Sequence, residues 1–245
     1  MMRTILFLLW ICAGPVVVMA AVPGDARQVL VGLTDGWGES HATLTFYERR
    51  GRGAWMEVGE SWPARVGREG MAWGRGLHTV PRDSRVGMKR EGDMKAPAGM
   101  FDLGGVWGYD ASVLRHPKMS YRQVTSRDLW IEDPKSAHYN RHLVLPHEPT
   151  ADWEKKGQMR QNDPAHSLKL FIAHNAPPNV EAGAGSAIFF HIWRANGGRP
   201  SAGCTTMDEA KLRELIARLD PTKRPVFVLL PKAEYARLRE AWRLP

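Results

Sequence analysis

The sequence predicts a mainly β (α+β) fold. The first two thirds of the chain contain short apolar or alternating runs, separated by turns and long connections rich in glycine and proline. Helical spacing of apolar residues is found in the C-terminal third, between further short apolar runs. Strands should therefore dominate, with helices near the end of the chain.

The first predicted strands include a hairpin. Residues 29–33 form a short apolar run, and residues 42–48 alternate apolar and polar side chains as a half-buried strand does. The turn 49–53, Arg-Arg-Gly-Arg-Gly, precedes the segment 54–58, which we expect to pair with the second strand.

Long connections follow the hairpin. Glycine and proline are dense from residue 67 to residue 108, and polar, proline-containing segments run from residue 112 to residue 163. A loop-rich region of this size usually surrounds a binding cleft. We find no internal repeat and no linker, so residues 21–245 are expected to form a single domain.

The C-terminal third combines strands and helices. Apolar runs short enough for buried strands occupy residues 168–173, 187–193 and 225–230. A helix is expected between the last two runs, and a closing helix is expected over residues 233–242, with apolar side chains on one side.

The first of these helices has a predicted start. Thr206 and Glu209 have the spacing of a capping box, and Leu212 to Leu219 repeat at helical intervals. Cys204 should therefore lie just upstream of a helix N-terminus.

Residues 1–20 are predicted to be a cleavable signal peptide. Arg3 gives a positive start, residues 5–18 are nearly all apolar, and small residues stand at the cleavage positions. The alternative is a retained membrane anchor, but Gly14-Pro15 interrupts the apolar run. Cys12 lacks the small-residue context of a lipoprotein signal. We therefore expect export to the periplasm or cell-wall space, with no stable membrane span after signal removal.

The charge balance is basic. The net charge of +8 becomes +7 once Arg3 is removed. This suits a polyanionic neighbour such as nucleic acid, anionic lipid or the carboxylate-rich bacterial wall, or serves solubility alone. Export and the lack of basic blocks interleaved with aromatics argue against nucleic acid.

Cys204 is the candidate nucleophile. It is the one cysteine outside the predicted signal peptide, so it has no partner for an internal disulfide. A helix N-terminus after it would favour the thiolate through free amide groups and partial positive charge. The alternative is a buried structural cysteine, for which a loop of glycine, proline and serine is a poor setting.

His191, thirteen residues before Cys204, is the candidate base. Gly203 allows a tight turn, and the amides of Gly203 and Cys204 could point at a developing oxyanion. Ser201 is expected to orient the loop or to donate a hydrogen bond. His174, at the end of another predicted strand, is the rival base. Either histidine could instead be a structural residue of the core whose ring nitrogens are hydrogen-bonded there.

A metal site is the other option considered. His138, His142 and His147 lie in a loop with Glu148, as a zinc metallopeptidase could require. The His-Glu-x-x-His arrangement is absent because Tyr139 follows His138. Since no glycine-rich phosphate loop follows a strand either, we predict neither a metal nor a cofactor.

The chain resembles the L,D-transpeptidase catalytic domain (YkuD-like) family. The family core is a histidine followed, after a loop, by Ser/Thr-x-Gly-Cys, which His191 and residues 201–204 match. Residues 89–101 are similar to the family segment Lys-x-x-Gly-Asp-x-x-Thr-Pro-x-Gly-x-Phe, with Ala96 in place of threonine. Further similarity lies in residues 128–136, 139–140 and 185–191, so the resemblance covers roughly residues 86–230.

This resemblance implies a β-sandwich-like fold and cysteine acyl transfer on peptidoglycan stem peptides. Cys204 would attack the carbonyl before a terminal D-alanine and form a thioester while His191 manages the protons. An amine of a neighbouring stem would then give a 3,3 cross-link, as an L,D-transpeptidase in cell-wall biogenesis does. Water would make the enzyme an L,D-carboxypeptidase, and a non-catalytic wall-binding protein is the competing class. The oligomeric state is not predicted.

The chain departs from the family pattern at two places. Many members follow the histidine with Gly-Thr and place an arginine two positions after the cysteine, whereas this chain has Ile192-Trp193 and Thr206. The group that holds the substrate carboxylate is therefore open, with Arg194 and Arg199 as nearby candidates.

Overall fold

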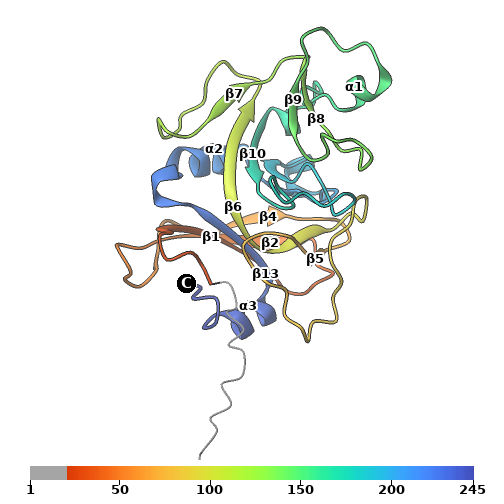
Figure 1. Cartoon of the computed structure of the whole chain (residues 1–245). Coiled ribbons are helices and arrows are strands. Elements are labelled where there is room, and N and C mark those ends of the chain that lie inside the picture. The colour runs from red at the N-terminus through yellow and green to blue at the C-terminus, as the bar shows by residue number, and fades with distance from the viewer. Residues whose placement is uncertain (1–20) are drawn as a thin grey trace, which may run out of the picture.

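The chain is mainly β with few helices, as the sequence predicts (Figure 1). The computed structural model describes residues 21–245, so the predicted signal peptide, residues 1–20 with Cys12, lies outside the described residues. Among the described residues, no helix is both long and apolar enough to cross a membrane.

The strands are β1 (Gln28–Thr34), β2 (His41–Glu48), β3 (Met56–Glu57), β4 (Trp62–Arg65), β5 (Met71–Trp73), β6 (Ala96–Gly108), β7 (Tyr121–Gln123), β8 (Asp128–Trp130), β9 (His142–Val144), β10 (Leu168–Ile172), β11 (Phe189–Ile192), β12 (Thr205–Met207) and β13 (Val226–Pro231). The helices are α1 (Asp152–Lys156), α2 (Glu209–Arg218) and α3 (Lys232–Leu238). Short 3₁₀ turns are η1 (Pro164–His166), η2 (Ala195–Gly197) and η3 (Pro221–Lys223).

Most strands belong to one hydrogen-bonded ring. The order is β1, β13, β6, β10, β11, β12, β4 and β2, and β2 pairs again with β1. Strand β1 is parallel to β13 and antiparallel to β2. Strands β8 and β9 form a separate two-stranded sheet. The sandwich detail implied by the family resemblance is not confirmed, because β1 links the two ends of the strand order.

Several predicted strands are confirmed. The hairpin is present, with Tyr47 opposite Glu57 and Glu48 opposite Met56, although β3 is shorter than predicted. The three apolar runs of the C-terminal third correspond to β10, β11 and β13. The local apolar pattern was sufficient here because these strands are buried along most of their length.

Strands β10 and β11 are buried on both faces. Alternate side chains enter a large core on one face and a smaller second core on the other, because successive residues of a strand point to opposite sides. Lys169 and His191 therefore lie on the face of the second core. That core consists of Val124, Trp130, Met159, Phe171 and Phe189.

The predicted start of the first long helix is wrong. Helix α2 begins at Glu209, and its N-cap is Asp208, whose side chain accepts a hydrogen bond of 2.8 Å from Ala210 N. Thr206 lies in β12 and pairs with His191 of β11. Strand pairing holds this β-branched segment extended and prevents a capping box at Thr206. Cys204 is therefore separated from α2 by a strand, and the expected helix-terminus effect on its thiol is lost.

The closing helix is present but shorter than predicted. Helix α3 ends at Leu238, and Trp242 follows it in a turn. The Trp242 amide donates to the Leu238 carbonyl at 2.8 Å. Leu238 and Trp242 are both buried in the large core. The apolar side of the predicted helix thus packs as expected, although only part of it is helical.

Asp128 ties together the excursion of residues 109–167, whose elements β7, β8, β9 and α1 gather at the top of Figure 1. Its fully buried carboxylate accepts bonds of 2.8 Å from Thr125 N, Thr125 Oγ1 and His142 Nε2, and another from Arg122 Nε. Burial opposes ionisation, but these hydrogen bonds outweigh it and lower the pKa of Asp128 to about 2.

We expect Asp128→Asn to reduce the free energy of unfolding by about 2–3 kcal/mol, because an amide cannot accept all of these bonds. In the native protein this contribution is complete above the ordinary pKa of 3.8 and is lost as the pH falls toward about 2, since the folded pKa is the lower one. Urea denaturation at neutral and acidic pH measures both effects. Asp152→Asn, at an exposed position of α1, is the control; an equal loss there would contradict this role.

Candidate active site

A pocket of about 340 Å³ lies beside the second core. Its walls come from the segment after β5, from β8 and the end of the excursion, from β10 and β11 with the segment that leads into β11, and from the loop between β11 and β12. Cys204 and His191 both line it, and so do Gly203 and Ser201. The structure therefore brings four of the predicted site residues into one cavity.

The Cys204 sulfur lies at the pocket wall. Its Sγ accepts a hydrogen bond from Phe189 N and donates to the Ala187 carbonyl, both at 3.4 Å. The residue remains partly exposed. Burial raises the pKa of the thiol to about 11, although the Phe189 amide favours the thiolate. Cys204 is thus a neutral thiol at pH 7, on a partly exposed residue of the pocket wall.

The loop before Cys204 is held by Ser201. Ser201 Oγ accepts from Gly203 N at 3.0 Å and donates to the Cys204 carbonyl at 2.5 Å. Gly203 has φ +148°, and a Cβ there would lie 2.9 Å from the Lys95 carbonyl oxygen. The sequence therefore needs glycine at this position, and the Gly203 amide is already engaged by Ser201.

His191 is buried on β11, with 3% of its surface exposed. Its Nδ1 donates to the Ile192 carbonyl at 2.8 Å, so in the neutral ring Nε2 carries the lone pair. Burial lowers the pKa of His191 to about 4, which keeps the ring neutral at pH 7. Within the described residues no hydrogen bond joins the ring to the Cys204 sulfur. The Ile192 carbonyl is the orienting group that the sequence did not identify.

His174 has a different environment. The ring is fully buried, its Nδ1 accepts from Arg75 N at 3.0 Å, and its Nε2 donates to the Ala184 carbonyl at 2.9 Å. Burial lowers its pKa to about 3. His174 does not line the pocket, and both of its ring nitrogens are engaged with backbone.

Two pocket residues beside His191 were missed by sequence reasoning. Lys169 on β10 lies opposite His191 in the sheet register, and the His166 ring lies 4.6 Å from the His191 ring between centroids. The signal for Lys169 was one lysine inside an apolar strand run, at a position facing away from the large core. His166 carried no local signal, because its contact with His191 is made only in the folded chain.

The histidines considered for a metal are engaged separately. His142 Nε2 bonds to Asp128 at 2.8 Å, and His147 Nε2 to Glu154 at 3.1 Å, while His138 is exposed. In residues 21–245 no group of three or more His, Cys, Asp or Glu side chains is arranged to hold a metal ion.

The basic candidates for carboxylate binding also differ. Arg194 lines the pocket and forms an ion pair with Asp163, whereas Arg199 is not part of the lining. Thr206, at the position of the family arginine, is buried outside the pocket.

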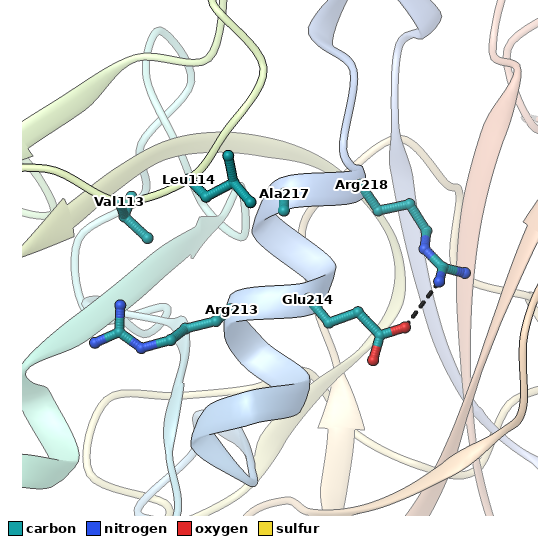
Figure 2. A pocket seen from close by; sticks show the side chains of 6 residues that line it. All are labelled: Val113, Leu114, Arg213, Glu214, Ala217 and Arg218. Carbon is teal, nitrogen blue, oxygen red and sulfur yellow. Dashed lines mark hydrogen bonds and ion pairs between the residues drawn. The ribbon is translucent and has the colours of Figure 1, made fainter.

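A second, larger hollow of about 640 Å³ lies beside α2 (Figure 2). Figure 2 shows Leu114 and Ala217 near each other, and Glu214 bonded to Arg218. The lining contains no nucleophile and none of the predicted site residues, so size does not identify the active site here. Its lining residues are Val113, Leu114, Arg213, Glu214, Ala217 and Arg218.

Comparison with known proteins assigns the family. The family model of the L,D-transpeptidase catalytic domain (YkuD) matches residues 39–228, which is most of the chain. No curated protein matches the sequence. The matched range begins upstream of the motif-bearing segment 86–230 and contains Cys204, His191 and every other residue that lines the pocket. The chain therefore belongs to the L,D-transpeptidase catalytic domain family.

Proposed function

We propose that this protein is an L,D-transpeptidase, a cysteine acyltransferase that acts on peptidoglycan stem peptides. Membership of the family supports an activity on peptidoglycan. The observation that carries the finer proposal is the cavity itself, where a partly exposed cysteine shares one pocket with an imidazole whose Nε2 carries the lone pair.

In the first half-reaction, Cys204 Sγ attacks the carbonyl before the terminal D-alanine of a stem peptide. The thiol proton passes to His191 Nε2, and the same proton then goes to the amine of the departing D-alanine. The products are a thioester on Cys204 and free D-alanine. The Cys204 amide is the oxyanion donor in this scheme, because the Gly203 amide already donates to Ser201.

In the second half-reaction, an amine of a neighbouring stem attacks the thioester and gives a 3,3 cross-link. If water attacks instead, the enzyme is an L,D-carboxypeptidase with the same first step. A non-catalytic wall-binding protein would use the same pocket without forming a thioester. His174 is not our choice of base, because both of its ring nitrogens already bond to backbone.

We further propose that residues 21–245 form one catalytic unit that works in the periplasm or cell-wall space after a signal peptide is removed. The length of the family match supports a single unit. The basic net charge suits a carboxylate-rich wall. The proposed reaction needs no cofactor and involves no nucleic acid.

Incubation with tetrapeptide stems should produce an acyl adduct on Cys204 that mass spectrometry detects as the tetrapeptide mass less D-alanine. Cys204→Ala should abolish both adduct and turnover, because no other described side chain offers a thiol. The circular dichroism spectrum and melting temperature of this variant should stay close to those of the native protein. Absence of any adduct across the pH range would instead favour a wall-binding protein.

His191→Ala should lower kcat/KM by about two to four powers of ten, the usual contribution of a positioned base. Because burial lowers the pKa of His191 to about 4, native activity should fall as the pH drops through that value and the ring gains a proton. Steady-state release of D-alanine measures both. His174→Gln is the matched control, for which stability should fall more than turnover; the opposite pattern would assign the base to His174.

Product analysis with and without an amine acceptor should separate the two outcomes of the thioester. We expect cross-linked peptide to dominate when a stem amine is present, since an amine is the better nucleophile toward a thioester once it is held in place. Liquid chromatography of the products gives the ratio. Exclusive formation of tripeptide with acceptor in excess would identify a carboxypeptidase.

A further inference from the structure

Lys169 is a buried cation that faces the pocket. It lies on β10 directly opposite His191 of β11, and only 4% of its surface is exposed. Its Nζ donates to the Met159 carbonyl at 2.9 Å and lies 5.9 Å from the centre of the Phe189 ring. A lysine ammonium has three donors. Within residues 21–245 the other two have no hydrogen-bond partner.

The other lysine and arginine of the pocket wall are each paired with a carboxylate. Lys89 Nζ bonds to Asp93 at 2.7 Å, and Arg194 is paired with Asp163. Of the lysines and arginines in this wall, Lys169 is the one that forms no ion pair with a carboxylate of the described residues. An unpaired buried charge is costly, and burial lowers the pKa of Lys169 to about 8. A purely structural strand position would be filled better by an apolar side chain.

The Cys204 sulfur is the group of this pocket whose negative charge the Lys169 ammonium can stabilise. Phe189 connects the two residues, because its ring lies below the ammonium while its amide donates to Sγ. A negative charge on Cys204 favours the ammonium of Lys169, as do Glu132 and Asp163. At the sulfur, Glu132 opposes ionisation, whereas Lys169 and Lys89 favour it. The remaining ionisable groups of the pocket are Lys89, Glu91, His166, His191 and Arg194.

The need for such a cation follows from the position of α2. With β12 between Cys204 and the helix, the helix N-terminus no longer offers positive potential at the sulfur. The apolar second core on one side of Cys204 disfavours a thiolate further. A fixed positive charge in the same pocket counteracts that penalty, because Coulomb attraction is strong where water is scarce.

We propose that the ammonium of Lys169 stabilises the thiolate of Cys204, an inference that rests on the nucleophile role proposed above. Ionisation breaks the S–H bond, leaves both electrons on sulfur and transfers the proton to His191 Nε2. Lys169 stays protonated throughout and exchanges no proton. Its role is thus electrostatic, and it is separate from the acid–base role of His191.

Alkylation of Cys204 tests this inference without any peptidoglycan. Iodoacetamide is uncharged and reacts with the thiolate, so its rate at a fixed pH near 7 reports the thiolate fraction. Mass spectrometry of the Cys204 peptide from the full chain follows the reaction. Lys169→Met keeps the length of the side chain and removes its charge, and it should slow alkylation about tenfold, the effect of one unit in thiol pKa.

Two variants control for nonspecific effects. Lys169→Arg should restore most of the rate, because it returns a positive charge to the same place. Lys156→Met, at an exposed position of α1, should leave the rate unchanged. Equal rates for native protein and folded Lys169→Met would overturn the inference, even if the acyl adduct on Cys204 forms. Slower alkylation of Lys169→Met without any adduct would uphold it and reject the transpeptidase.

A second measurement needs no variant and can still overturn the inference if Lys169→Met does not fold. A cation beside the sulfur attracts anionic iodoacetate more than neutral iodoacetamide. The iodoacetate rate divided by the iodoacetamide rate should therefore be about threefold higher in the native protein than in the same protein unfolded in urea. A native ratio no higher than the unfolded one would overturn the inference.

Discussion

Burial of β10 and β11 on both faces is the constraint from which the site follows. Each strand supplies alternate side chains to two cores, so a polar residue on the second face must sit either inside apolar packing or at the edge of a cavity. Lys169 and His191 occupy the second of these environments. The loop that ends in Cys204 closes the same cavity, because β12 pairs with β11 and brings the loop against it.

The same burial sets the protonation states at neutral pH. It raises the pKa of Cys204 and lowers that of His191, so thiol and imidazole are both uncharged before substrate arrives. Reactivity then depends on fixed groups around the sulfur. The Phe189 amide is one such group, and in our proposal Lys169 is another. The Ile192 carbonyl fixes the tautomer that leaves Nε2 as the acceptor.

The features that depend on neighbouring residues in the chain could be predicted from the sequence. Apolar periodicity predicted the hairpin and the buried strands, and the family motif pointed to the cysteine and histidine that share the pocket. The spacing of Thr206 and Glu209 misled, because the pairing that keeps Thr206 extended comes from a distant strand. The difference between His174 and His191 depends on backbone groups brought in by folding. Lys169 was missed for a similar reason, since nothing in its strand shows that a cavity lies beside it.

The ring of strands has a consequence for how the chain folds as it is synthesised. Strand β13 inserts between β1 and β6, although it is the last strand in the chain. Its parallel pairing joins Val29 to Val226, and contacts between such distant segments form slowly. Until then, β1 and β6 each present an open edge to neighbouring molecules. A chain that stops short of residue 226 should therefore tend to associate with its copies through these edges instead of completing the ring.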